Sequence, residues 1–184
     1  MNYKLTSIVL LLLSIAISSE AQKRGAVWCF GDSSLVDFSD TSNIALGTSA
    51  VRSRGSCATI CNSSGSLLFY SSYDYDFNSI GGPAFQNGEI FNSQHSTMQN
   101  GDSIVMAGWY YETVIVPFPL SDSLYYVFST NVTGNSIKGL FYSIVDMSLN
   151  GGLGAVIQKN VQLENFKTVD CLSAVKHGNG RAWC

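Results

Sequence analysis

The stretch Gly139–Leu163 reads GLFYSIVDMSLNGGLGAVIQKNVQL, and it decides the fold class. Apolar residues alternate with small or polar ones over Leu140–Met147 and again over Ala155–Leu163, which is the period of a strand with one buried face. Between these runs, the glycine-rich segment Asn150–Gly154 supplies the backbone freedom that a tight reversal needs. The stretch therefore predicts two antiparallel strands joined by a turn.

Upstream, Ser123–Thr130 has the same character, and with the pair above it predicts a meander, the unit of propeller blades and β-sandwiches. Leu46–Arg54 is polar with little pattern, and Tyr73–Glu89 is rich in Asp, Asn and Gly, so we expect a long loop at Tyr73–Glu89. Further short apolar runs are predicted as strands at the start of Ala26–Phe38 and at Cys57–Ile60, Ser66–Ser71, Ile90–Phe91, Ser103–Ala107 and Thr113–Phe118.

The chain contains an internal repeat. CATICNSSGSLLFYS (Cys57–Ser71) resembles VIVPFPLSDSLYYVFS (Val114–Ser129), and a third copy begins in LSAVKHGNGRAWC (Leu172–Cys184). The aligned turns begin at Ser64, Ser121 and His177, so the two intervals between them are nearly equal. A period of roughly 50 residues with several strands is typical of propellers. We expect an all-β chain of propeller-like antiparallel blades, about two complete and a third begun, at roughly 57–113, 114–171 and 172–184.

The N-terminal segment 1–21 is predicted to be a signal peptide. Lys4 gives the positive region, Ile8–Ile17 is the apolar run, and Ser19–Ala21 is a small-x-small cleavage site before Gln22. About ten apolar residues are too few to span a ~30 Å hydrocarbon core. We therefore expect an exported protein, extracellular or on the outer cell surface, with no transmembrane segment in the mature chain. An uncleaved membrane anchor is the alternative.

Charge and cysteines restrict the function further. The formal net charge is −3, so nothing resembles the basic footprint of a nucleic-acid-binding protein. If Cys57 and Cys61 share an extended strand, their α-carbons are about 13 Å apart, whereas a disulfide needs about 7 Å or less. We expect most of the five cysteines to be small buried hydrophobic residues, and one disulfide remains possible among them. The five are Cys29, Cys57, Cys61, Cys171 and Cys184.

Several strings of this chain, taken in order, are similar to one family. They resemble the N-terminal propeller-like region of large secreted proteins from gliding-type bacteria, which end in a type IX secretion sorting domain or a gliding-associated C-terminal domain. The strings are Trp28–Gly31 with Asp37–Phe38, Cys57–Ile60 with Leu68–Tyr70, Phe91–Gly101, Leu124–Phe128, Gly139–Gly154 and Ala174–Gly180.

The resemblance implies an exported, non-catalytic surface or extracellular module that is the N-terminal piece of a longer protein. Two features depart from the family. Tyr73–Glu89 is longer than the corresponding family segment, and the family continues through further blades where this chain ends at Cys184. If a blade's packing face is left open, we expect self-association through open sheet edges.

Phe30–Asp37 resembles the Gly-Asp-Ser-Leu block of a serine esterase family, with Ser33 as the nucleophile. A serine nucleophile needs a base, which that family takes from a late Asp-x-x-His pair. Here the late histidine is His177, and Ala174 stands where the aspartate should be. The block carries an extra serine, and no strand–helix alternation is present. A loop leaving the first strand is the preferred interpretation, and the esterase is the alternative.

Asp74, Asp76 and Asn78 have the spacing of a calcium loop, but Ser79 and Phe85 exclude an EF-hand. An irregular calcium loop and a solvated insertion both remain open. His95 and His177 belong to no metal-spaced cluster, so we read them as turn or packing residues. Apart from the open calcium loop, the sequence predicts no metal site and no cofactor.

Aromatic residues are the candidate ligand contacts. Exposed on loops, they would stack on sugar rings or anchor a protein partner, whereas buried they would be packing residues. The sequence thus favours a non-catalytic binding or scaffolding module whose partner is an unknown extracellular protein or glycan. The candidates are Tyr73, Tyr75, Trp109, Tyr110 and Tyr111.

Overall fold

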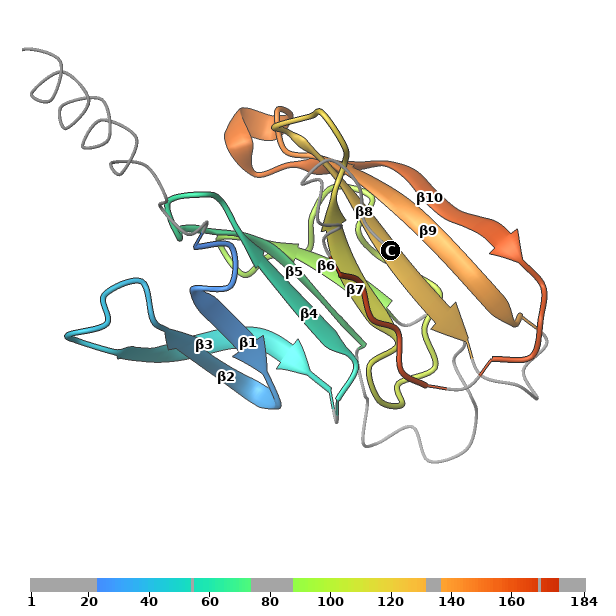
Figure 1. The fold of residues 1–184 in the computed structure, drawn as a ribbon, viewed down its shortest axis with the longest axis horizontal. Helices are drawn as coiled ribbons and strands as arrows, with labels where there is room; N and C mark the ends of the chain where they lie inside the picture. The colour runs from blue at the N-terminus through green and yellow to red at the C-terminus, as the bar shows by residue number, and fades with distance from the viewer. Residues whose placement is uncertain (1–22, 54, 74–87, 132–136, 169, 176–184) are drawn as a thin grey trace, which may run out of the picture.

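The computed structural model describes residues 23–53, 55–73, 88–131, 137–168 and 170–175, which contain ten β-strands and no α-helix. The strands form three antiparallel sheets, each a meander of consecutive strands (Figure 1). The predicted all-β class is confirmed. None of the described segments is a helix with the length and apolar character needed to cross a lipid bilayer.

The first sheet consists of β1 (Val27–Phe30), β2 (Asp32–Asp37) and β3 (Ala45–Arg52). The expectation of a loop over Asp32–Asp37 was wrong, because Gly31 (φ 65°) and Ser33 (φ 63°) reverse the chain tightly and β2 pairs back onto β1. Strand β3 was not predicted either. Its first four residues are exposed, so alternation between buried and open positions begins only at Ser49.

The second sheet consists of β4 (Cys57–Cys61), β5 (Leu67–Tyr73) and β6 (Gly88–Asn92), where short strands were predicted. The turn between β4 and β5 is closed by Asn62, whose side-chain oxygen accepts hydrogen bonds from the Ser64 and Ser66 N–H groups at 3.0 and 2.9 Å. Cys57 and Cys61 share the extended β4, which is the case in which the sequence excludes a disulfide between them, and both are free. The described cysteines, Cys29, Cys57, Cys61 and Cys171, are all free thiols.

The third sheet consists of β7 (Thr113–Pro117), β8 (Leu124–Asn131), β9 (Gly139–Asp146) and β10 (Ala155–Glu164), in the order β10-β9-β8-β7. The hairpin predicted from Gly139–Leu163 is confirmed as β9 and β10. Its turn is closed by Asn150, whose side chain donates to the Gly154 carbonyl at 2.9 Å. Ser103–Ala107 is not a strand; Ile104 makes only an isolated bridge to Gly88.

The second and third sheets begin with equivalent hairpins. Cys57 pairs with Ser72 in the second sheet, and Thr113 pairs with Ser129 in the third, so both members of the pair recur after nearly the same interval. The blade boundaries expected at 57–113 and 114–171 enclose β4–β6 and nearly all of β7–β10, while the sheet β1–β3 precedes them. Of the third expected copy, 172–175 is described and contains no strand, and 176–184 lies outside the described residues.

Each pair of neighbouring sheets encloses its own core. Between the first and second sheets lie Val27, Cys29, Val51, Cys61, Tyr70 and Phe91. Between the second and third sheets lie Ile60, Phe69, Ile90, Ile115, Tyr125, Val127 and Val145. Burial of a large apolar side chain contributes roughly 1.5–3 kcal/mol, so these two layers hold the sheets together.

The first strands of the three sheets lie next to one another but do not all run the same way. The Val27 N–H donates to Cys61 Sγ at 3.3 Å and the Cys29 N–H to Thr59 Oγ1 at 3.1 Å, so β1 runs antiparallel to β4. In contrast, β4 and β7 begin side by side, since the Tyr111 N–H donates to the Gly55 carbonyl at 3.2 Å. The step from the first sheet to the second therefore differs from the step from the second to the third, because the first strands run in opposite directions only in the former.

Candidate functional site

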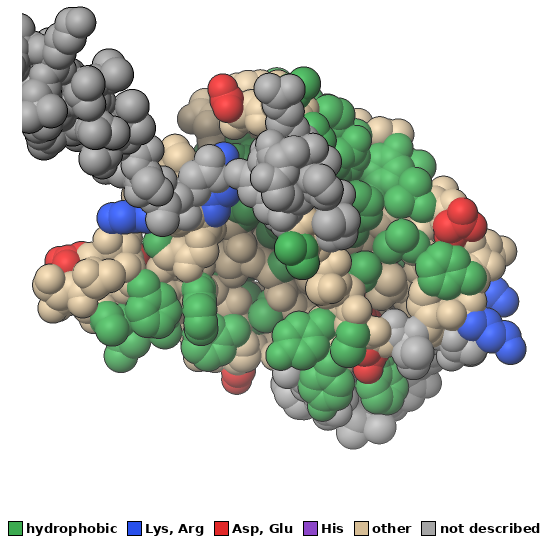
Figure 2. All heavy atoms as spheres, in the orientation of Figure 1, with side chains coloured by type: hydrophobic (Ala, Val, Ile, Leu, Met, Phe, Trp, Pro, Cys, Tyr) green, Lys and Arg blue, Asp and Glu red, His purple; other side chains and the backbone are tan. Residues whose placement is uncertain are grey.

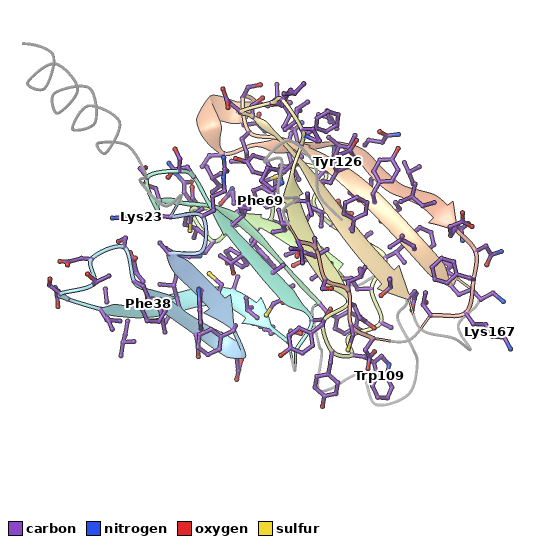
Figure 3. The ribbon with its side chains drawn as sticks, viewed as in Figure 1. Lys23, Phe38, Phe69, Trp109, Tyr126 and Lys167 are labelled. Carbon is purple, nitrogen blue, oxygen red and sulfur yellow. The ribbon has the colours of Figure 1, made fainter. Side chains whose placement is uncertain are left out.

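Aromatic side chains surround a cleft between β1, the start of β4 and the loop that leads into β7. The cleft has a volume of about 770 Å³. Figure 2 shows hydrophobic side chains gathered over the first sheet and again at the foot of β7, where Figure 3 places Trp109. The rings that line the cleft are Trp28, Phe30, Tyr110 and Tyr111, and its floor includes Cys57, Ala58 and Thr59.

One wall of the cleft is β1. Along this strand, Val27 and Cys29 point into the core while Trp28 and Phe30 point outward, with exposed fractions of 56% and 41%. The Trp28 indole is held from both sides. Its Nε1–H donates to the Gly25 carbonyl at 2.9 Å, and its ring meets the Phe38 ring edge-on at 5.2 Å. A ring fixed in this way loses little conformational entropy on binding.

The opposite wall is the loop Ala107–Tyr111. The Tyr110 ring lies on Gly55, where an added Cβ would stand 2.6 Å from a ring carbon, so this close approach needs glycine. Tyr111 adopts a positive φ of 53° and donates its N–H to the Gly55 carbonyl. Trp109, Tyr110 and Tyr111 are 54%, 50% and 65% exposed.

A buried carboxylate holds this loop in place. Glu112 is fully buried, and its Oε2 accepts hydrogen bonds from the Ala107 and Gly108 N–H groups at 2.9 and 2.8 Å and from Ser56 Oγ at 3.4 Å. Its Oε1 has no hydrogen-bond partner among the described residues. Burial raises the pKa of Glu112 above its ordinary value, although the backbone N–H groups act in the opposite direction. Glu112 is thus a positioning residue for the aromatic loop.

The lining favours an uncharged ligand. None of the described residues that line the cleft carries a charged side chain. Exposed rings offer flat apolar surfaces, and the hydroxyls of Tyr110 and Tyr111 add hydrogen-bonding groups. Such sites bind ligands that are flat and apolar on one face and polar at the edge.

The candidate aromatic residues predicted from sequence divide into three cases. Trp109, Tyr110 and Tyr111 are all exposed, and Tyr110 and Tyr111 line the cleft, whereas Trp109 is not among its lining residues. Tyr73 is instead buried in the core, where its ring packs against Gly108, so it is not a surface contact. Tyr75 lies outside the described residues.

Sequence reasoning missed Trp28, Phe30 and Glu112. The alternation in Val27–Phe30 was visible, but which of its two faces stays open depends on where the second sheet packs. Glu112 is a single acidic residue beside an aromatic group, and only its burial beneath the loop shows its role.

Ser33 lies elsewhere, beside a separate cavity of about 320 Å³ that Arg52, Glu89 and Phe91 also line. His95 is not among the residues of that cavity; its Nδ1 lies 3.1 Å from the Tyr70 hydroxyl, which also accepts a hydrogen bond from the Ala50 N–H at 2.9 Å. His177, the base considered for an esterase, lies outside the described residues. Ser33 thus faces a small polar cavity on sheets that are wholly antiparallel.

Within the described ranges, no group of three His, Cys, Asp or Glu side chains is arranged to hold a metal ion. The candidate calcium ligands Asp74, Asp76 and Asn78 lie outside those ranges. No family model, curated protein or solved structure matches this chain.

Proposed function

We propose that the protein is a non-catalytic, exported binding module that holds a neutral glycan in the cleft between β1 and the Ala107–Tyr111 loop. One observation carries the proposal. Trp28 and Tyr110, which are distant in sequence, line the same cleft with rings that are each half exposed or more, and none of the described residues of that cleft is charged. Export rests on the predicted signal peptide.

Sugar rings suit this cleft because a pyranose has flat faces of C–H groups and a rim of hydroxyls. The faces stack on aromatic rings, and the hydroxyls pair with groups such as the Tyr110 and Tyr111 hydroxyls. An acidic or basic ligand would find no opposite charge among the described lining residues. A protein partner that inserts an apolar side chain is the competing ligand.

We also propose that the second and third sheets are consecutive blade-like units of a propeller-like scaffold. Their equivalent hairpin registers and the shared direction of β4 and β7 support this arrangement. The antiparallel orientation of β1 makes the first sheet an exception, and the cleft forms where that exception meets the regular units.

The test is a glycan array followed by titration of the wild type, Trp28→Ala and Tyr110→Ala with one oligosaccharide that binds. Loss of an anchor ring typically costs about 2 kcal/mol or more, so we expect the affinity of each variant to fall by about 30-fold. Leu120→Ala is the matched control, because Leu120 is 96% exposed and does not line the cleft. Silence of the array, or affinities that neither cleft variant changes, would contradict the proposal.

A further inference from the structure

The third sheet has one face in the core and an opposite face, called here the outer face, that no described strand covers. On the core side, Tyr125, Val127 and Val145 are nearly or fully buried. On the outer face the aromatic side chains are half-buried and contact one another. Tyr126 is the centre of this group, with its ring centroid 4.7 Å from Phe118, 5.4 Å from Phe128 and 5.6 Å from Tyr142.

The repeat shows what such a face is for. In the second sheet Ile60 pairs with Phe69, and at the equivalent place in the third sheet Val116 pairs with Tyr126. Phe69 is fully buried because the next sheet covers it, with Tyr125 meeting it edge-on at 5.4 Å. Tyr126 therefore occupies in the third sheet the position that Phe69 occupies in the second, where Phe69 contacts the next sheet.

The chain also returns to the place from which such a sheet would begin. Tyr111 precedes the third sheet as Gly55 precedes the second, so the two residues are one repeat apart. The Tyr111 N–H donates a hydrogen bond to the Gly55 carbonyl. After β10, the Cys171 and Leu172 N–H groups donate to the Tyr110 and Tyr111 carbonyls at 3.2 and 2.8 Å. Leu172 thus relates to the third sheet as Tyr111 relates to the second.

We infer that the outer face of β7–β10 is the docking face for a further antiparallel sheet of this same repeat, entered through Cys171 and Leu172. The contact would repeat the interface between the second and third sheets. The new sheet would cover Tyr126 as the third sheet covers Phe69 through Tyr125 and Val127. The inference rests on the proposal that the second and third sheets are consecutive units of one repeat, and it does not depend on the glycan proposal. A second copy of the chain is the competing occupant.

The test supplies a further sheet of the repeat in register with the third. A second copy of Tyr111–Cys171 is inserted between Cys171 and Leu172. The substitution Phe128→Trp in the first copy places a fluorescent reporter on the outer face. Its fluorescence is obtained by subtracting the signal of the same chain without that substitution. We expect acrylamide quenching of the reporter to fall several-fold on insertion. In the matched control the inserted copy carries Val127→Asp on its core side, and the reporter should remain as accessible as in the chain without insertion.

Equal quenching with and without the insertion would overturn the inference. A second measurement requires no insertion and decides the matter if the longer chain fails to fold. Sedimentation of the natural chain carrying Phe128→Trp should show a monomer whose reporter stays accessible at every concentration, in place of the self-association expected from the sequence. A dimer whose reporter becomes protected as concentration rises would assign the outer face to a second copy and overturn the inference.

Discussion

At the scale of single residues, Glu112 connects stability with the shape of the cleft. It is a fully buried carboxylate that collects the N–H groups of Ala107 and Gly108 and leaves one oxygen without a partner among the described residues. Burial of a charge is unfavourable unless the charge is compensated, and Asp170 adds a further negative charge to its surroundings. The protein thus accepts the unfavourable burial of this carboxylate at the place where its hydrogen bonds hold the loop that carries Trp109–Tyr111.

The raised pKa of Glu112 predicts a specific pH dependence. The folded protein holds this proton to a higher pH than the unfolded chain, where the ordinary value is 4.5. The stabilisation from this group is therefore complete below the unfolded value and is lost as the pH rises through the folded pKa. The free energy of unfolding of the wild type should fall, relative to Glu112→Gln, as the pH rises from about 4 towards 8.

Urea denaturation of both proteins across that pH range measures the difference. Asp37, Asp102 and Asp146 have lowered pKa values because of hydrogen bonds to Ser39, Lys159 and Ser148, and they act in the opposite direction. They are present in both proteins, so their contribution cancels. Parallel curves would show that Glu112 titrates normally in the folded state.

At the scale of elements, the β9–β10 hairpin depends on glycines for two different reasons. Gly151 lies in the turn with φ 66° and has open space where a Cβ would stand. Gly139 begins β9 with φ 111°, and a Cβ there would collide with the Glu164 carbonyl at the end of β10. The first glycine meets only a conformational requirement, whereas the second also allows two strands to approach.

This difference predicts unequal costs for the same substitution. Gly151→Ala should destabilise the protein by about 1–2 kcal/mol, the cost of a left-handed conformation for a residue with a side chain. Gly139→Ala adds displacement of the β10 backbone, and we expect about 3 kcal/mol or more. Chemical denaturation of the two variants gives both values, and equal losses would mean that β9 and β10 separate without cost.

The elements also show how far the sequence could be read. Strands β8 and β9 were predictable because buried and half-buried positions alternate along most of each strand, whereas β10 is mostly exposed and its pairing with β9 shifts register. Strand β3 was not predictable, since half of it is exposed on both faces. For the site, the sequence shows the aromatic group Trp109–Tyr111 directly. That Trp28 lines the same cleft as Tyr110 and Tyr111 depends on how the sheets pack, and no local sequence pattern predicts that packing.

At the scale of the whole molecule, the sheets form a stack whose internal faces are covered, whereas no described strand covers the two end faces. Two internal cores lie between the three sheets. At one end, Trp28, Phe30 and Leu46 are exposed on the first sheet, and at the other end Tyr126 and its neighbours are half-buried on the third. The described part of the molecule thus offers an aromatic cleft beside the first sheet and an aromatic face on the third sheet that no described strand covers.

The central claim, that the second and third sheets are two copies of one unit stacked face to face, is tested most directly by comparing Phe69→Ala with Tyr126→Ala. The two positions are equivalent in register, but among the described strands a following sheet covers only Phe69. Urea denaturation should give a loss of about 3–5 kcal/mol for Phe69→Ala and about 1–2 kcal/mol for Tyr126→Ala, whose side chain is half-buried. Equal losses would contradict the claim, because the two positions would then have the same surroundings.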